Sequence, residues 1–486
     1  MKKKFVINLA ILLFLNLLVK LFWIFKIDRT VQITVGASVY GTYFSLLSLS
    51  VIFNIFLDAG LNNFNNRALA QDPKLFRDQF PGILALKVML TVLYAIICLG
   101  TGMVLHYDHQ QFHLLWMLVI NQALASFILF FRSNISGLQM FITDSLLSVT
   151  DRFIMIIICA VLLWSGSPSG PFRIEWFVYA QTASYVMALL VAVFVLSARV
   201  GLPRFRLHRR ALISVLGKSL PFALLILLMG FYNRIDSVMI ERMLPVNGKE
   251  QAGIYAQAFR LLDAFSMFGV LFAGLLLPMF ARMLARKENA TELLRLSLLL
   301  ILIPSLLISI GSWAYGKEIM GMLYPQHVEQ STVILQYLMT GFLGISVTYI
   351  FGTLLTANGS LRALNLMASF TLLLNVALNL LLIPRLQATG SAIASMSTQL
   401  FAALLQIFIS FRLLRLKMGY MLPGKLCLFV ILLAALAFLS TRLTIHWPVN
   451  LLAFLLGGFI LAEILQLFSI PGLFRLIRED TGTRIT

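Results

Sequence analysis

The sequence predicts an all-α integral membrane protein, and three observations lead to that class. Of its 486 residues, 60% are hydrophobic and only 12% are charged, and the mean hydropathy is +0.92. Soluble proteins carry about 25% charged residues. The apolar residues gather in runs of about 20, which is the length that a helix needs to cross a bilayer. This composition excludes a soluble enzyme, a nucleic-acid-binding protein and a disordered chain.

About 14 such runs follow one another along the chain. Helices are expected because the backbone polar groups must be satisfied internally in lipid. The first run follows Lys2, Lys3 and Lys4 and imitates a signal peptide, but no cleavage site follows it, so we expect an uncleaved first helix. The runs lie at residues 5–26, 38–61, 80–105, 112–131, 145–165, 176–198, 214–240, 252–280, 291–312, 333–356, 362–384, 389–411, 424–441 and 449–468.

The basic residues predict the orientation. The formal net charge is +19, and positive charge collects in cytoplasmic loops. If the N-terminus is cytoplasmic, the basic stretches at 199–210 and 412–425 both fall on the cytoplasmic side. Arg132 and Arg152 are then assigned to the cytoplasmic connection between the fourth and fifth spans. We therefore expect both termini in the cytoplasm.

Two basic linkers predict the domain organisation. They follow the sixth and the twelfth span. This spacing favours an N-terminal six-helix lobe at 1–200, a second six-helix lobe at 211–415, and an additional helix pair at 422–470. No loop is long enough to form a further domain.

A weak internal repeat supports two related halves. VYGTYFSLL at 39–47 aligns with QAGIYAQAF at 251–259, and the alignment pairs Gly41 with Gly253. Each segment opens the second helix of its half. A duplicated transporter is therefore favoured.

Charged and amide side chains inside the spans are the candidate functional residues, because such groups are costly in hydrocarbon and usually face a protein interior or a wet cavity. Ser50, Asn54 and Asp58 share one helix face, since they are four residues apart. The alternative for Arg260 is an ion pair with Asp263, and the alternative for Asp58 is a structural role at a helix end. The candidates for substrate binding in a cavity are Lys20, Asn54, Arg234 and Arg260, and those for a coupling ion are Asp58, Asp236 and Asp263.

Other polar residues are expected to be structural. Lys87, Asp151, Lys218 and Glu463 lie near the predicted cytoplasmic ends, where a long side chain can reach water. The three histidines of HYDHQQFH at 106–113 are interpreted as a polar interfacial loop rather than a metal site. The sequence contains no phosphate-binding GxxxxGK[ST] motif. We expect no catalytic residue, metal or cofactor.

Three segments in order resemble a known family. They are GASVYGTYFSLLSLSVIFNIFLDAGLNNFNNRALA at 36–70, RIDSVMIERMLPVNGKEQAGIYAQAFRLLDAF at 234–265, and NGSLRALNLMASFTLLLNVALNLLLIPRLQATGSAIAS at 358–395. They are similar to the signature segments of bacterial polysaccharide flippases. By this resemblance the sequence is identified as a member of the O-antigen/polysaccharide exporter (Wzx-type) branch of the multidrug/oligosaccharidyl-lipid/polysaccharide (MOP) flippase superfamily. Lipid II flippases and multidrug and toxin extrusion (MATE) exporters are relatives.

The resemblance implies a transporter and not an enzyme. It implies two lobes around a cationic cavity and the movement of an undecaprenyl-diphosphate-linked oligosaccharide across the bacterial inner membrane by alternating access. Lys20, Arg234 and Arg260 would face the diphosphate. The implied partners are this lipid-linked oligosaccharide, membrane lipids, and a polysaccharide polymerase or glycosyltransferases; nucleic acid is not among them.

Three alternatives stay open. A lipid II flippase would share the additional helix pair. A MATE-like exporter of small cations would favour acidic over basic cavity residues, which this sequence does not. An O-antigen polymerase or ligase would need a sizeable outer loop, and the outer connections here are short.

Overall fold

The computed structural model describes residues 18–62, 65, 69, 75–138, 140–164, 171–200, 209–416 and 421–467. The regular elements in this part of the chain are all helices, and it contains no strand. Eleven of the helices are long and apolar enough to cross a membrane. The prediction of an all-α, multi-pass membrane protein is therefore confirmed.

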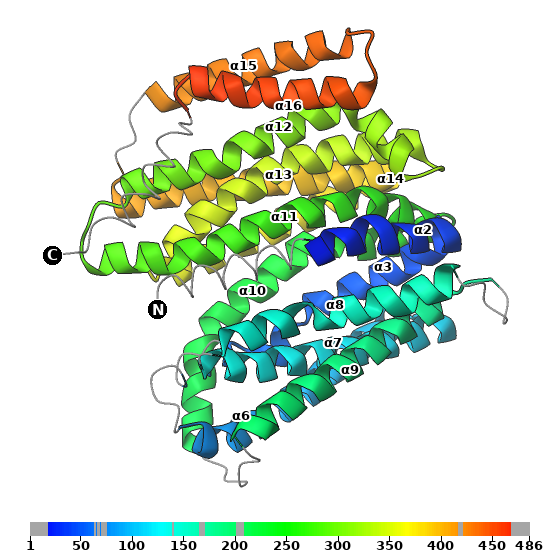
Figure 1. The fold of residues 1–486 in the computed structure, drawn as a ribbon, viewed down its shortest axis with the longest axis vertical. Helices are drawn as coiled ribbons and strands as arrows, with labels where there is room; N and C mark the ends of the chain where they lie inside the picture. Colours follow the sequence, from blue (N-terminus) through cyan, green and yellow to red (C-terminus); the bar gives the residue numbers. More distant parts are fainter. Residues whose placement is uncertain are drawn as a thin grey trace. The chain divides into compact units, whose positions relative to one another are not determined.

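Figure 1 shows the helices in the order in which they follow one another along the chain. The first predicted span begins outside the described residues, so the number of spans and the orientation stay predictions. The elements are the π-helix η1 (Trp23–Asp28) and the α-helices α2 (Arg29–Val35), α3 (Ala37–Ile52), α4 (Ile55–Asp58), α6 (Leu75–Val104), α7 (His109–Gly137), α8 (Phe141–Trp164), α9 (Ile174–Val200), α10 (Arg209–Met243), α11 (Gly248–Ala285), α12 (Thr291–Leu323), α13 (Val328–Ala357), α14 (Leu361–Leu414), α15 (Met421–Thr441) and α16 (Trp447–Ile464).

The second predicted span is interrupted. The sequence predicts one helix over 38–61, whereas α3 ends at Ile52 and a single further turn, α4, follows it. Ala59 and Gly60 then adopt left-handed backbone conformations, with φ of 44° and 83°. The last carbonyl groups of a helix have no partner within it, so this break leaves acceptors in the protein interior for other side chains.

Helix α14 joins two predicted spans. The sequence places a connection between 384 and 389, and the structure has a kink there, at Gln387, whose φ of 53° and ψ of −135° are not helical. Pro384 lies one turn before the kink. Proline removes a helical hydrogen bond and disfavours a straight helix, which accounts for the position of the kink.

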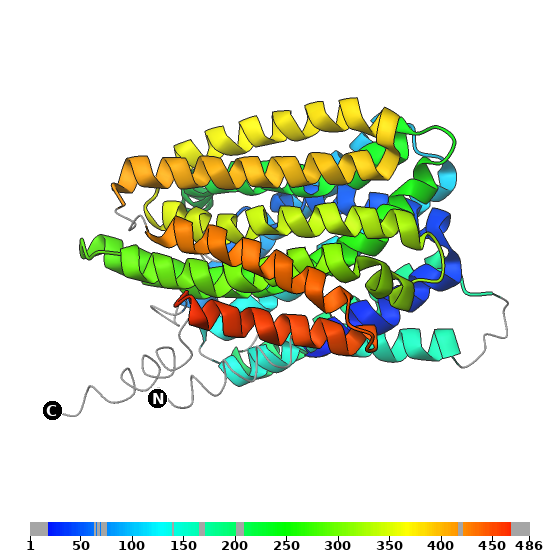
Figure 2. The same cartoon turned by 90° about the horizontal axis from the view of Figure 1, so that it is seen from above.

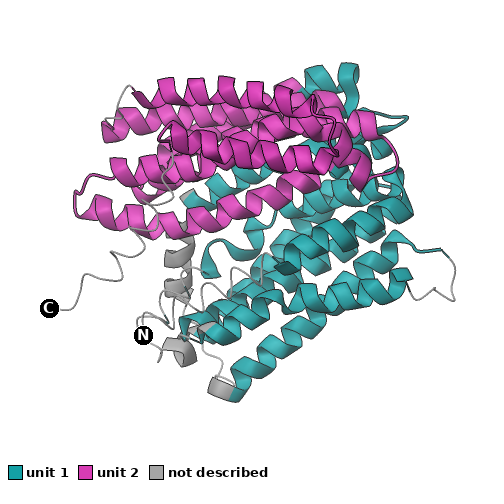
Figure 3. Cartoon of the chain, turned by 45° about the horizontal axis from the view of Figure 1, so that its top comes forward, with its two compact units in different colours: residues 1–257, 379–388 teal, residues 258–378, 389–486 magenta. Residues whose placement is uncertain are grey.

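The chain divides into two compact units (Figure 3). Unit 1 comprises residues 1–257 with 379–388, and unit 2 comprises residues 258–378 with 389–486. In unit 1, α3 packs against α7 and α10, and α9 packs against α7 and α8. The linker between the two predicted lobes lies largely outside the described residues, so the division into two six-helix lobes stays a prediction.

Unit 2 contains the additional helix pair. Helices α15 and α16 lie side by side and pack against α12 (Figure 2). Phe429, Leu433 and Phe454 are completely buried in the shared apolar core. The Tyr315 hydroxyl of α12 also donates a hydrogen bond of 2.6 Å to Ser440 Oγ of α15. Apolar packing and a buried hydrogen bond together fix the pair on α12.

The two glycines paired by the internal repeat meet at one helix crossing in unit 1. A Cβ atom on Gly41 of α3 would overlap the carbonyl oxygen of Lys249, and a Cβ atom on Gly253 of α11 would overlap that of Ala37. Small residues allow backbones to approach this closely in membrane proteins. The repeat therefore places its glycines at the contact between the two related helices.

We expect Gly253→Ala to destabilise unit 1 by about 1–3 kcal/mol, the usual cost of overpacking, because the new methyl group must push α11 away from Ala37. Thermal unfolding of the purified protein in detergent measures the effect. Gly274→Ala in the same helix is the matched control, since a Cβ atom there meets nothing within 4 Å. An equal loss of stability in both variants would mean that the crossing does not need glycine.

Candidate functional site

Asp58 is bound by a buried lysine. Lys87 Nζ lies 3.3 Å from Asp58 Oδ1 and donates a hydrogen bond of 3.1 Å to the Leu57 carbonyl oxygen. The Lys87 side chain has no exposed surface, whereas that of Asp58 is 28% exposed. The prediction that Lys87 reaches out to water is therefore wrong, because the helix break after α4 supplies acceptors inside unit 1.

Asp236 is held by two neutral donors. Tyr255 donates its hydroxyl to one carboxylate oxygen and Asn379 donates its side-chain amide to the other, each at 2.9 Å. The residue is 1% exposed. Asp236 thus occupies a polar interior position in unit 1 that the sequence alone could not show, because its partners come from α11 and α14.

Arg260 forms the ion pair that is the structural alternative to a binding role. Its Nη1 atom lies 3.5 Å from Asp263 Oδ2, three residues further along α11 in unit 2. Both side chains keep partial exposure, at 15% and 23%. Arg234 is half-buried on α10 in unit 1. The two predicted cavity arginines therefore lie in different units.

Asn54 lies at the break between α3 and α4. Its side-chain amide donates a hydrogen bond of 2.9 Å to Gln122 Oε1 of α7. This contact ties the interrupted helix to its neighbour and places two amide groups together inside unit 1.

Lys20 lies within a group of charged residues that we call the basic cluster: Lys20, Arg132 and Arg152, with the carboxylates Asp144 and Asp151. Lys20 is half-buried and interacts electrostatically with Arg152, Asp151 and Arg132. Within the described part of the chain it makes no hydrogen bond or ion pair. Burial of a lysine ammonium in a span is costly, and the neighbouring Arg152 and Arg132 add repulsion that Asp151 only partly offsets, so an anion would stabilise this site.

Arg152 lies at the midpoint of α8, roughly 17 Å from either end at a rise of 1.5 Å per residue. Its assignment to a cytoplasmic connection is therefore wrong, and so is that of Arg132, which lies within α7. The reason is that α7 continues to Gly137 and α8 begins at Phe141, so the connection is only a few residues long. Asp151, beside Arg152, is equally far from the helix ends.

Aromatic rings hold Arg152 in place. Its guanidinium carbon lies 5.6 Å from the ring centre of Trp23 and 5.8 Å from that of Tyr185, distances at which cation–π attraction operates. Both rings are buried, each with 8% exposure. Lys20 and Trp23 share a face of the first helix, since they are three residues apart. The rings therefore orient Arg152 toward the face that carries Lys20.

The two carboxylates of the cluster differ in how closely they contact an arginine. Arg132 Nε lies 2.7 Å from Asp144 Oδ1, the length of a strong charge-assisted hydrogen bond. Arg152 Nε lies 3.6 Å from Asp151 Oδ2, which is longer than such a bond. Three cations and two carboxylates give the cluster one net positive charge when all are ionised.

A polar stripe on α8 could have revealed this site from the sequence. Asp144, Ser148, Asp151 and Arg152 recur at intervals of four, three and one residues and so fall on one side of a helix. The same side faces the cluster, because Asp144 meets α7 and Arg152 meets Trp23 and Tyr185. Because Arg152 is assigned to a cytoplasmic connection, the prediction from the sequence does not include this stripe.

A second polar network joins the ends of several helices in unit 1. Glu241 of α10 accepts hydrogen bonds from Ser45 Oγ, at 2.8 Å, and from the Gln111 side chain. Asp108 caps α7 and pairs with Lys249 at 3.4 Å. Burial disfavours the charged form of Asp108, but the backbone N–H of Gln111 and the Lys249 ammonium outweigh it, so the pKa of this carboxyl lies below its usual value. These contacts connect helices and include none of the candidate binding residues.

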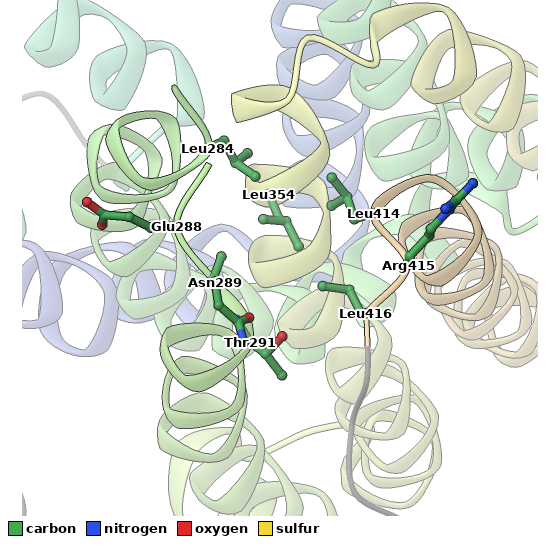
Figure 4. A pocket seen from close by; sticks show the side chains of 9 residues that line it. Leu284, Glu288, Asn289, Thr291, Leu354, Leu414, Arg415 and Leu416 are labelled. Carbon is green, nitrogen blue, oxygen red and sulfur yellow. The ribbon is translucent and has the colours of Figure 1, made fainter. Parts of the chain in front are cut away.

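A pocket of about 280 Å³ lies in unit 2, beside the connection between α11 and α12 (Figure 4). Its apolar lining comes from Leu284, Leu354, Leu414 and Leu416. Two of its polar groups have local partners, since Asn289 Oδ1 accepts from the Thr291 backbone at 2.9 Å and Glu288 pairs with Arg286 at 3.7 Å. None of the candidate binding residues lines this pocket.

Comparison with known proteins gives a family match and a fold match. Residues 6–284, more than half of the chain, match the family model described as polysaccharide biosynthesis protein. No curated protein sequence matches the chain. The lipid II flippase MurJ in an inward closed conformation is similar in structure, with 14% identity, a TM-score of 0.66, and coverage of 95% of this chain and 97% of MurJ.

Two further solved structures are similar. An inward-facing MATE family multidrug resistance transporter of the MOP superfamily has 14% identity and a TM-score of 0.60, and the match covers 80% of this chain and 98% of that one. A MOP superfamily transporter from Pyrococcus furiosus, described as having a binding pocket of reverse polarity, has 14% identity and a TM-score of 0.57, with coverage of 84% and 93%. At this level of identity, the structural similarity establishes the fold alone.

Proposed function

This chain belongs to the polysaccharide biosynthesis protein family and has the fold of MOP-superfamily transporters, and we propose that it is a flippase for an undecaprenyl-diphosphate-linked oligosaccharide. It acts in the bacterial inner membrane by alternating access and breaks no bond. The lipid tail stays in the bilayer while the sugars and the diphosphate cross.

The observation that carries the proposal is the basic cluster, whose Arg152 lies at the middle of the membrane-spanning helix α8. A diphosphate loses its hydration on entering hydrocarbon, which is costly unless charged partners replace the water. The ammonium group of Lys20, for which no hydrogen bond or ion pair is seen among the described residues, and the guanidinium of Arg152, which packs on two aromatic rings, supply such partners. A transporter of small cations would instead be expected to leave a carboxylate unpaired at this position.

The other candidate residues have separate proposed roles, in substrate binding or in ion coupling. Arg234 and Arg260 remain proposed contacts for the head group, and Asn54 a proposed contact for its sugars. Asp58 and Asp263 are already paired with cations in their units. Asp58, Asp236 and Asp263 all remain proposed candidates for ion coupling, and Asp236 accepts hydrogen bonds from Tyr255 and Asn379.

The substrate alternatives share part of this chemistry. Lipid II also carries a polyprenyl diphosphate, so the basic cluster suits both substrates, and the family match favours a polysaccharide precursor. A polysaccharide polymerase or glycosyltransferases would act before and after the transport step, and we propose them as partners.

Deletion of the gene tests the proposal. We expect undecaprenyl-diphosphate oligosaccharide to accumulate on the cytoplasmic face of the inner membrane and surface polysaccharide to disappear, because the carrier no longer crosses. Mass spectrometry of extracted lipids and surface staining measure both, and plasmid-borne wild-type protein should restore them. Accumulation of lipid II would support the lipid II alternative, and unchanged lipid-linked sugars with altered resistance to organic cations would support the exporter.

A further inference from the structure

We propose that the side-chain amides of Asn54 and Gln122 form a sugar-recognition site inside unit 1, where they bind a hydroxyl or acetamido group of the transported oligosaccharide. This inference rests on the proposed function, because it assumes that the transported lipid carries sugars. Gln122 then determines which sugars are accepted, whereas the basic cluster binds the diphosphate that all such lipids share.

Gln122 lies deep within a membrane-spanning helix. It is close to the midpoint of α7, about 20 Å from either end at a rise of 1.5 Å per residue. Gln122 and Asn54 are both partly exposed. Polar groups are costly against lipid tails and are tolerated at this depth when they face protein or a water-filled cavity. The exposed part of the amide pair is therefore expected to face a wet space that a polar substrate can enter.

The pair has an acceptor and a donor that the protein does not use. Asn54 donates its amide nitrogen to Gln122 Oε1 at 2.9 Å, while Asn54 Oδ1 is buried without a partner. A buried acceptor without a partner is costly, so a donor from a ligand is favoured there. Among the described residues, no hydrogen bond from the Gln122 amide nitrogen is seen. A sugar hydroxyl donates and accepts, and an acetamido group has one N–H and one carbonyl, so either group complements the pair.

The amide that precedes Gln122 on α7 has a different environment. Asn121 is 1% exposed, and both of its side-chain polar atoms are bonded to α9. Its Oδ1 accepts from the Thr182 hydroxyl at 2.7 Å, and its Nδ2 donates to the Val178 carbonyl oxygen at 3.3 Å. Asn121 therefore joins two helices, and Gln122 is the amide of the two that is available to a ligand.

The break between α3 and α4 fixes the position of Asn54. A Cβ atom on Gly230 of α10 would lie 3.3 Å from the Ile52 carbonyl oxygen at the end of α3, so the two backbones are close at this point. Phe231 of α10 packs edge-on against Phe53, with ring centres 5.8 Å apart. Aromatic rings with a few fixed polar groups are typical of small-molecule sites, and rigid support keeps such groups in place.

The spacing to the basic cluster fits an oligosaccharide joined to a diphosphate. Gln122 and Arg132 are ten residues apart on α7, which is about 15 Å along the helix axis. A diphosphate bound by the basic cluster would therefore place the sugars, and not the phosphates, at the level of the amide pair.

The test measures the binding of two lipids to the purified full-length chain in detergent. One is the lipid-linked oligosaccharide extracted from the deletion strain and identified by mass spectrometry. The other is undecaprenyl diphosphate, which carries no sugar. Both are expected to bind through the basic cluster, so only the first should depend on the amide pair. Microscale thermophoresis gives the two dissociation constants.

Gln122→Leu should weaken the binding of the lipid-linked oligosaccharide by roughly 5- to 100-fold, the range for two neutral hydrogen bonds, because the donor is removed and Asn54 loses the partner that orients it. Binding of undecaprenyl diphosphate should stay at the wild-type level. Gln122→Met serves as a second variant if the leucine protein does not yield monodisperse material. Gln110→Leu is the matched control: it is the same substitution on the same helix, at an exposed amide that bonds Glu175 at 3.0 Å, and it should change neither dissociation constant.

Two results overturn the sugar-recognition site and leave the proposed function intact. Wild-type binding of the lipid-linked oligosaccharide by Gln122→Leu and Gln122→Met would show that the amide pair contacts no sugar. Equal losses for the two lipids would show that Gln122 only supports the packing of α7 against the break after α3. Failure of the wild-type chain to bind the lipid-linked oligosaccharide would instead count against the proposed function, and this inference would fail with it.

Discussion

Arg152→Ala is expected to abolish export while leaving the amount of protein in the membrane normal. The side chain lies at the midpoint of α8 and is 29% exposed, so we expect its removal to cost less stability than the loss of a fully buried group. Each charge-assisted hydrogen bond to the substrate is worth about 1.5–3 kcal/mol, or roughly 10- to 150-fold in affinity. Surface polysaccharide and lipid-linked intermediate in a complemented deletion strain measure the effect.

Arg152→Lys should retain part of the activity, because the charge remains while the planar fork that stacks on Trp23 and Tyr185 is removed. Arg286→Ala is the control, since that arginine is exposed at the α11–α12 connection and lies in the other unit. Full export by Arg152→Ala, or equal reductions in Arg152→Ala and Arg286→Ala, would contradict a role for Arg152 in binding the diphosphate.

The fold class is predictable from the sequence because it depends on summed properties. Composition, the length of the apolar runs and the resemblance of three segments all average over many residues, and the structural class and family match agree with them. The repeat pairing Gly41 with Gly253 is also informative, because the same residues form the crossing of α3 and α11.

The positions of individual charges are harder to predict, because they depend on where a helix ends. The distribution of basic residues assigns Arg152 to a cytoplasmic connection, although the residue falls within the predicted span at 145–165. The tertiary contacts that keep it inside the span come from Trp23 and Tyr185, both distant in sequence. Arg260 illustrates the opposite case, because its partner Asp263 is local and the sequence can suggest the pair.

Lys87 is the clearest example of a charged side chain whose environment depends on where a helix ends. Its position near a predicted helix end suggests an exposed ammonium group, but α4 is interrupted at Ala59. The Leu57 carbonyl and the Asp58 carboxylate therefore point to it in the interior. A helix break depends on backbone geometry, which cannot be predicted from hydropathy or from the pattern of charges.

Lys87→Met is accordingly expected to destabilise the protein by about 3–5 kcal/mol, the usual cost of removing one partner of a buried ion pair. Methionine has a similar length, so the effect is mainly electrostatic: the Leu57 carbonyl loses its ammonium donor and Asp58 loses its counter-ion. Thermal unfolding in detergent measures the change in stability. Lys87→Met with wild-type stability would show that the Lys87 ammonium contributes nothing to holding the break after α4.

The double variant Lys87→Met with Asp58→Asn separates a structural role of this pair from a coupling role. It should recover a large part of the stability, because no unpaired charge remains. If Asp58 serves a coupling ion, the double variant should be stable but inactive in export, since the carboxylate that would carry the ion is absent. Recovery of both stability and export would identify the pair as purely structural, and would leave Asp236 and Asp263 as the carboxylates to test for coupling.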